Sequence, residues 1–170
     1  MNVSDRSEAF LLCKTNSSAL DLADALAGDT GIAWAQPVFG PFPVVAYLSA
    51  TNRKDLTTSI ESLRLRSEIH QLDARFCKFI PGDDELSAPE TSQPERAVLL
   101  IGVDLSVAKE REVTYALRSL DQVVLARAMW GPDDIIIIIE ESDRESMRNF
   151  ICDVVKVTKG VKSVSTLYAY

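Results

Sequence analysis

The sequence predicts an α+β fold made of two tandem copies of one unit, each with the element order β-α-β-β-α-β. The first observation behind this prediction is a repeated Gly-Pro turn, at Gly40-Pro41 and again at Gly131-Pro132, followed both times by an apolar run. The second is a constant offset of 91 residues between the copies, which needs no gap from the turn to the end of the chain. Repetition of this kind is stronger evidence for an architecture than local propensity.

In the first copy, the polar residues Asn16-Ser17-Ser18 precede a segment with apolar residues at helical spacing, which Gly28 and Gly31 end. Asn52 is a candidate cap for a second helix, whose apolar residues recur every three or four positions. Pro37 cannot donate a hydrogen bond to a neighbouring strand, which predicts an edge position for the second strand. The predicted strands are Ala9–Lys14, Ile32–Phe39, Val44–Ala50 and Ile69–Ile80.

The second copy repeats this order. Its helices are predicted to begin at a Ser106 cap and near Asp143. The predicted strands are Ala97–Val103, Val123–Trp130, Ile135–Glu140 and Val161–Tyr170. Each half therefore has the order of a ferredoxin-like unit, in which the first and third strands lie at the centre of an antiparallel sheet.

The run of five isoleucines, Ile135–Ile139, indicates a strand that is buried on both faces, because a strand with one wet face alternates. Two helices cover only one face of a four-stranded sheet. We therefore expect the two four-stranded antiparallel sheets to pack face to face as a dimeric α/β-barrel-like pair, within one chain or between chains. The alternative is that the isoleucines reflect β-propensity on a partly exposed strand.

Composition and charge bound the class of protein. The predicted domains are a first repeat at 1–80, an acidic, proline-rich linker at 81–95 and a second repeat at 96–170. The net charge of −7 opposes direct binding to a phosphate backbone. No apolar stretch approaches the roughly 20 residues that span a bilayer, and the N-terminus lacks a signal-peptide pattern, so we expect a cytoplasmic protein without membrane contact.

Candidate chemistry is sparse. Cys13, Cys77 and Cys152 are too few and too widely spaced to predict a disulfide framework or a zinc site, although Cys13 and Cys77 fall on strands expected to be neighbours. The single histidine, His70, cannot complete a Ser-His-Asp or two-histidine set. Asp73, further along the same strand, could face the side of His70 and orient it. We predict no catalytic residues, no metal and no cofactor.

Two short motifs carry a family resemblance. The turn Gly131-Pro132-Asp133-Asp134 opens an apolar strand, and Lys159-Gly160-Val161-Lys162-Ser163-Val164 leads into the last strand. In these motifs each half resembles the effector-binding domain of the Lrp/AsnC transcription regulators, an ACT-like, ferredoxin-like module that dimerises face to face. Only eight residues precede the first predicted strand, so we expect no helix-turn-helix domain, and Pro43 stands where Asp134 stands in the second copy.

The resemblance implies a non-enzymatic module for transcription regulation, which binds a small effector such as an amino acid. The effector would contact Gly131, Asp133 and Asp134, with self-association or a DNA-binding relative as partner. The turn is equally consistent with a plain connection between strands, for which glycine, proline and aspartate are common. Two further alternatives are a small ferredoxin-like barrel enzyme, of the monooxygenase type, and a purely structural assembly unit.

Overall fold

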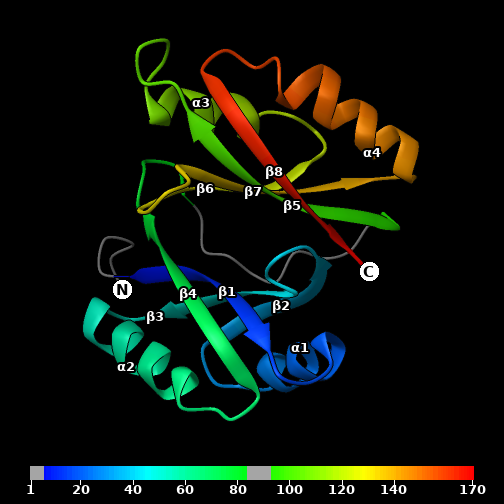
Figure 1. Cartoon of the computed structure of the whole chain (residues 1–170). Helices are drawn as coiled ribbons and strands as arrows, with labels where there is room; N and C mark the ends of the chain where they lie inside the picture. Colours follow the sequence, from blue (N-terminus) through cyan, green and yellow to red (C-terminus); the bar gives the residue numbers. More distant parts are fainter. Residues whose placement is uncertain (1–5, 84–92) are drawn as a thin grey trace. The chain divides into compact units, whose positions relative to one another are not determined.

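The computed structural model describes residues 6–83 and 93–170, which form eight strands and four α-helices in the α+β order predicted from the repeats (Figure 1). Most of the predicted linker lies outside the described residues. The chain divides into two compact units. As far as they are described, the first comprises residues 6–77 with Tyr170, and the second comprises residues 78–83 and 93–169.

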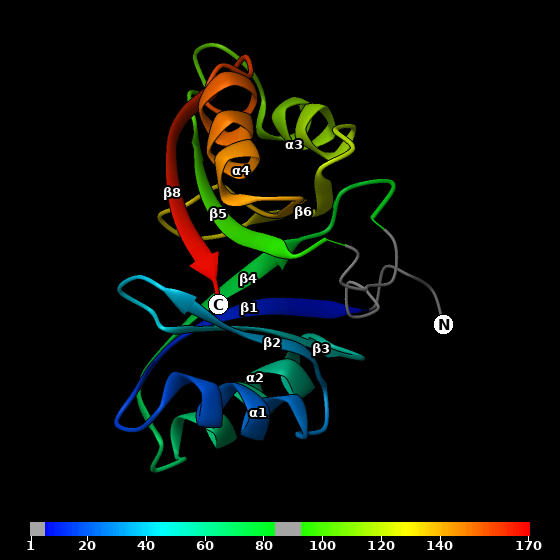
Figure 2. The same cartoon turned by 90° about the vertical axis from the view of Figure 1, so that its right-hand side faces the viewer.

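In the first unit, helices α1 and α2 lie on one face of an antiparallel sheet (Figure 2). The strand order is β4-β1-β3-β2, so the first and third strands are central, as predicted. Within this order β2, which carries Pro37, is terminal. The elements are β1 (Ser7–Thr15), α1 (Ala19–Ala27), β2 (Ile32–Phe39), β3 (Val44–Ala50), α2 (Arg53–Arg64) and β4 (Ile69–Lys78).

The second unit has the equivalent strand order β8-β5-β7-β6. Its last helix differs, because α4 continues into a short π-helix, η2, in which the Lys156 N–H donates to the carbonyl of Ile151. The elements are β5 (Glu95–Val103), α3 (Glu110–Arg118), β6 (Val123–Met129), β7 (Ile135–Glu141), α4 (Arg144–Phe150), η2 (Ile151–Val155) and β8 (Val161–Ala169).

The prediction that the two copies align without a gap from the turn to the chain end is wrong, because the register of β4 and β8 shows an offset of 92 residues and not 91. Ala9 and Ala97 are equivalent, because they pair with Leu48 and Ile139, which stand 91 residues apart. Ala9 pairs with Phe76 on its other side, whereas Ala97 pairs with Tyr168, at an offset of 92. The second copy therefore holds one additional residue between β7 and β8, where the wider turn of η2 lies.

The predicted helix starts are confirmed at three of four places. Ser18, Asn52 and Asp143 each cap a helix, with side-chain oxygens that accept a backbone N–H three residues on. Ser106 is not a cap, because Asp104 Oδ1 accepts hydrogen bonds from its N–H and its hydroxyl and holds it in a turn. Helix α3 begins four residues later, at Glu110.

The isoleucine run is buried on both faces, as predicted. Ile135, Ile137 and Ile139 belong to the core between sheet and helices, whereas Ile136 and Ile138 point to the opposite face. All five side chains have an exposed fraction of 0%. The face-to-face packing of the two sheets stays a prediction. No helix within residues 6–83 and 93–170 is long and apolar enough to cross a membrane.

Gly31 shapes the turn between α1 and β2. Its φ is +86°, and an added Cβ would lie 3.1 Å from Leu48 Cδ1 and 3.3 Å from the Ser49 carbonyl oxygen. The carbonyl of Gly31 accepts the N–H of Ser49, which joins the turn to β3. Because L-residues rarely adopt this φ, glycine is required here.

We predict that Gly31→Ala lowers the free energy of unfolding by about 1–3 kcal/mol, because it adds backbone strain and a steric contact. Gly28→Ala is the matched control, since Gly28 has a helical φ of −86° and an added Cβ meets only ordinary contacts. It should be neutral or slightly stabilising. Chemical denaturation measures both, and equal effects of the two substitutions would contradict the role of Gly31.

Candidate functional site

The turn predicted as an effector site connects β6 to β7. Gly131 has a φ of +125° and is exposed, and Asp133 is half-buried. Asp134 Oδ2 accepts the N–H of Val103 at 2.8 Å, and the Asp134 N–H donates to the Ile101 carbonyl at 2.9 Å. These bonds give the Asp134 carboxylate a structural role at the end of β5. Effector binding at Gly131, Asp133 and Asp134 stays a prediction without a test.

The first unit builds the same turn with Pro43 in place of Asp134. The Val38 N–H donates to the Pro43 carbonyl at 2.9 Å, as the Met129 N–H does to the Asp134 carbonyl at 2.8 Å. The backbone bond is thus common to both copies. The bond between the Asp134 side chain and Val103 belongs to the second copy alone, since proline has no carboxylate.

His70 and Asp73 do not form a pair. They stand three positions apart on β4, so alternation does not place them on one face. His70 is exposed, and Asp73 Oδ2 accepts two hydrogen bonds from Arg75, the shorter at 2.8 Å. Among the described residues, no hydrogen bond joins His70 to Asp73.

The two cysteines on neighbouring strands are also separate. Cys13 lies in the core between the sheet and the helices, opposite Leu72, and burial raises the pKa of its thiol to about 12. Cys77 follows Phe76 and therefore points to the other face of β4. Within the described part of the chain, no group of histidine, cysteine or acidic side chains is suited to hold a metal ion.

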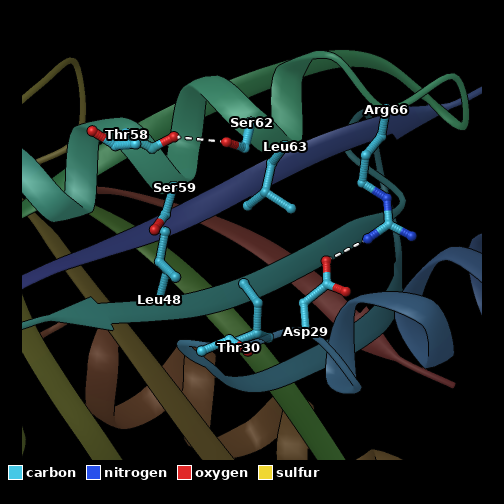
Figure 3. A pocket seen from close by; sticks show the side chains of 9 residues that line it. Asp29, Thr30, Leu48, Thr58, Ser59, Ser62, Leu63 and Arg66 are labelled. Carbon is cyan, nitrogen blue, oxygen red and sulfur yellow. Dashed lines mark hydrogen bonds and ion pairs between the residues drawn. The ribbon is translucent and has the colours of Figure 1, made fainter.

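The first unit has a pocket of about 370 Å³ between α2, β3 and the α1–β2 turn (Figure 3). Its volume falls in the range of small-molecule sites. Ile32, Leu48 and Leu63 form an apolar floor. The polar lining residues are Asp29, Thr30, Thr58, Ser59, Ser62 and Arg66.

An ion pair stands at one end of this pocket, where Figure 3 shows Arg66 pointing toward Asp29. An Arg66 guanidinium nitrogen donates to Asp29 Oδ2, and its other terminal nitrogen donates to Glu68 Oε1 at 3.3 Å. Glu68 and Asp29 raise the pKa of Arg66, so its charge is fixed. Among the described residues, Asp29 Oδ1 accepts no hydrogen bond, which leaves it available to a ligand.

Local sequence explains this placement. Helix α1 ends at Gly28, and the turn that Gly31 permits presents Asp29 and Thr30 toward α2. Leu63 anchors the last turn of α2 in the core, and the Arg66 N–H donates to the Leu63 carbonyl. The two ends of the ion pair are therefore held by two short, hydrogen-bonded turns.

The second unit lacks this pair. Leu120 is the counterpart of Asp29, since each accepts the N–H of the first residue of the next strand. Thr158 is the counterpart of Arg66. Each donates its N–H to the carbonyl of the last buried helix residue, and the carbonyl of each accepts the N–H of the first residue of the next strand. The same turns thus form with Leu120 and Thr158, and the fold itself does not require the charged pair.

Sequence reasoning missed Asp29 and Arg66. The available signal was a comparison of the two copies, in which each of these charged residues stands opposite an uncharged residue of the other copy. The second unit has a smaller pocket, of about 280 Å³, beside the corresponding turn, with Gln122, Glu140 and Ser142 among its lining residues. Glu140 is held there by Arg96 at 2.6 Å.

Together, the fold and the pocket define an α+β protein with two ferredoxin-like units, the first of which holds a pocket of small-molecule size. No family model and no curated protein matches the sequence. The structure of the siroheme decarboxylase NirDL, in complex with an iron-uroporphyrin III analogue, is similar over 96% of this chain and 71% of its own, with a TM-score of 0.69 and 10% identity. An anthrone oxidase-like protein matches 97% of this chain and 90% of its own, with a TM-score of 0.60 and 8% identity.

FFRP-DM1 is 25% identical over 45% of this chain and 99% of its own, with a TM-score of 0.42. This match concerns less than half of the chain, so the Lrp/AsnC resemblance stays a likeness of one domain. The structures that match nearly the whole chain include an enzyme, the siroheme decarboxylase. That finding overturns the expectation of a non-enzymatic regulatory module that senses an amino-acid-like effector.

A resident haem does not fit the pocket of the first unit. The lining has no histidine, cysteine, methionine or tyrosine to bind iron. His70, the only histidine of the chain, is on β4 and not among the lining residues.

We predict that Asp134→Ala destabilises the protein by about 1–3 kcal/mol, because it leaves the Val103 N–H without its charged acceptor. Asp134→Asn keeps an oxygen at this position and should lose less. Thermal unfolding of both variants measures the effect. An unchanged midpoint for Asp134→Ala would show that the carboxylate is dispensable for the fold.

Proposed function

We propose that the chain is an enzyme and that its substrate binds in the pocket of the first unit. The observation that carries this proposal is the Asp29–Arg66 ion pair at the pocket, because the second unit builds the same turns without it. Support also comes from the full-length likeness to the siroheme decarboxylase. An ion pair that lines a pocket and that the fold does not need is a good candidate for function.

Each group in the pocket has a role in this proposal. Asp29 Oδ1 is the group that accepts a proton or a hydrogen bond from the substrate, since its other oxygen is occupied by Arg66. Arg66 positions the Asp29 carboxylate. Thr30 and Ser59 provide hydroxyls without hydrogen-bond partners in the described part of the chain, and the apolar floor takes the carbon skeleton.

Two substitutions on α2 test the location of the site. Ser59→Leu fills the pocket, whereas Thr57→Leu, on the same helix, changes an exposed hydroxyl that donates to the Arg53 carbonyl and does not line the pocket. Wild-type protein is incubated with a metabolite extract, and consumed compounds are identified by mass spectrometry. We predict that Ser59→Leu lowers consumption at least tenfold and that Thr57→Leu leaves it unchanged.

Asp29→Asn should lower consumption of the same compound while the protein stays folded, because a part-exposed ion pair contributes only about 0–1 kcal/mol to stability. Circular dichroism provides the folding control. If Ser59→Leu and Asp29→Asn both consume the compound at the wild-type rate, the active site lies elsewhere. If the wild type consumes nothing from the extract, the proposal of an enzyme fails.

A second candidate function is chemistry on a tetrapyrrole substrate with several carboxylates. What favours it is the likeness to the decarboxylase that was solved with an iron-uroporphyrin III analogue. In the second unit, Arg127 of β6 is buried, and arginine is a residue type that binds carboxylates in a bidentate manner.

For this candidate, titration with iron-uroporphyrin should shift the absorption maximum of the porphyrin, and Arg127→Gln should weaken the effect. Haem, which has fewer carboxylates, serves as the control ligand and should bind more weakly. Absence of a spectral change at micromolar protein would exclude a tetrapyrrole substrate. Equal binding of haem and iron-uroporphyrin would contradict recognition through carboxylates.

A further inference from the structure

The pocket of the first unit presents hydrogen-bond acceptors toward its ligand. The hydroxyl of Thr58 donates to the Lys54 carbonyl at 3.0 Å, and that of Ser62 donates to the Thr58 carbonyl at 3.1 Å. Each of these hydroxyl protons is therefore used within α2. What remains on both oxygens is acceptor capacity, because a hydroxyl has one proton and two lone pairs.

The charged groups point in the same direction. Both terminal nitrogens of Arg66 already donate to carboxylates, one to Asp29 and the other to Glu68. The Glu68 backbone N–H and then Arg66 lower the pKa of the Glu68 carboxyl, so this group is ionised near neutral pH. Asp29 and Arg66 line the pocket, and Glu68 contacts Arg66 from outside the lining. The cluster of these three residues therefore carries one net negative charge at this end of the pocket, with an open acceptor at Asp29 Oδ1.

From these contacts we infer that the substrate of this pocket is a small organic ammonium ion with an apolar skeleton. This inference rests on the proposed function, which places the substrate in the same pocket. The ammonium group donates to Asp29 Oδ1 and to the α2 hydroxyl oxygens, since it has several N–H donors and no acceptor. The skeleton covers Ile32, Leu48 and Leu63, whose side chains are buried.

The same cluster disfavours anionic head groups. A carboxylate or phosphate would meet its net negative charge, and both terminal nitrogens of Arg66 already donate to carboxylates. A neutral alcohol can donate only one hydrogen bond and gains nothing from the negative charge. The ammonium ion is therefore preferred both for its positive charge and for its larger number of hydrogen-bond donors.

Three probes of the same skeleton test this inference in the full-length protein. They are cyclohexylmethylamine, cyclohexylmethanol and cyclohexanecarboxylate, and their binding is followed through the backbone amide NMR signals of residues 29–32 and 58–66. We expect the amine alone to shift these signals in a saturable manner. The affinity should fall about fivefold in Asp29→Asn, since an ion pair at a part-exposed site is worth about 1 kcal/mol.

Salt and a matched variant provide the controls. Addition of about 1 M NaCl should weaken amine binding, because it screens charges beyond a few ångströms. Asp21→Asn alters another carboxylate of the first unit, outside the pocket lining, and should leave the affinity unchanged. Equal loss in both variants would show a nonspecific effect of net charge and overturn the inference.

The outcomes separate the inference from the proposed function. Binding of the alcohol as tightly as the amine, or preference for the carboxylate, overturns the ammonium class while a site in the pocket stands. Binding of the amine with unchanged substrate consumption by Ser59→Leu would leave an ammonium site that is not the active site. If none of the three probes shifts the pocket signals, the ammonium site fails, and the consumption assay with Ser59→Leu and Asp29→Asn alone decides the proposed function.

Discussion

The pairing of two apolar central strands in each unit is the interaction on which the rest of the structure depends. In the first unit Leu11 of β1 lies opposite Ala46 of β3, and in the second Leu99 of β5 lies opposite Ile137 of β7. All four side chains are fully buried. This register fixes where β3 ends, and hence where Leu48 forms the pocket floor and where the Ser49 N–H meets the turn of Gly31.

Much of the fold follows from the sequence because its determinants are local or periodic. The strand β3 was predicted with its observed bounds, and the Asn52 and Asp143 caps act through a side-chain oxygen three residues before its partner. The Ser106 cap was wrong for an equally local reason, since Asp104 competes for the same hydroxyl. The extra residue before β8 escaped detection because strand register is set by pairing between distant segments.

The site was harder to predict than the fold. Glycine and aspartate in Gly131-Pro132-Asp133-Asp134 formed a conspicuous motif, but Asp134 is used to hold the Val103 N–H. Asp29 and Arg66 are 37 residues apart and belong to no motif. They meet only because two turns lie at the same end of α2 and α1. Composition and spacing do not show that two such residues form a pair. Comparison with the second copy does give a signal, because Leu120 and Thr158 stand in the corresponding places.

The π-helical turn at Ile151–Val155 has a consequence for how proteins of this architecture vary. A π-helical hydrogen bond encloses one residue more than an α-helical one, so a helix can accommodate an inserted residue without a change in the strands on either side. These strands then keep their pairing partners. Length differences between copies should therefore occur just after Phe150, within the helix and outside the strands. An alignment that opens its gap at this point brings each residue of β8 opposite its true structural equivalent in β4.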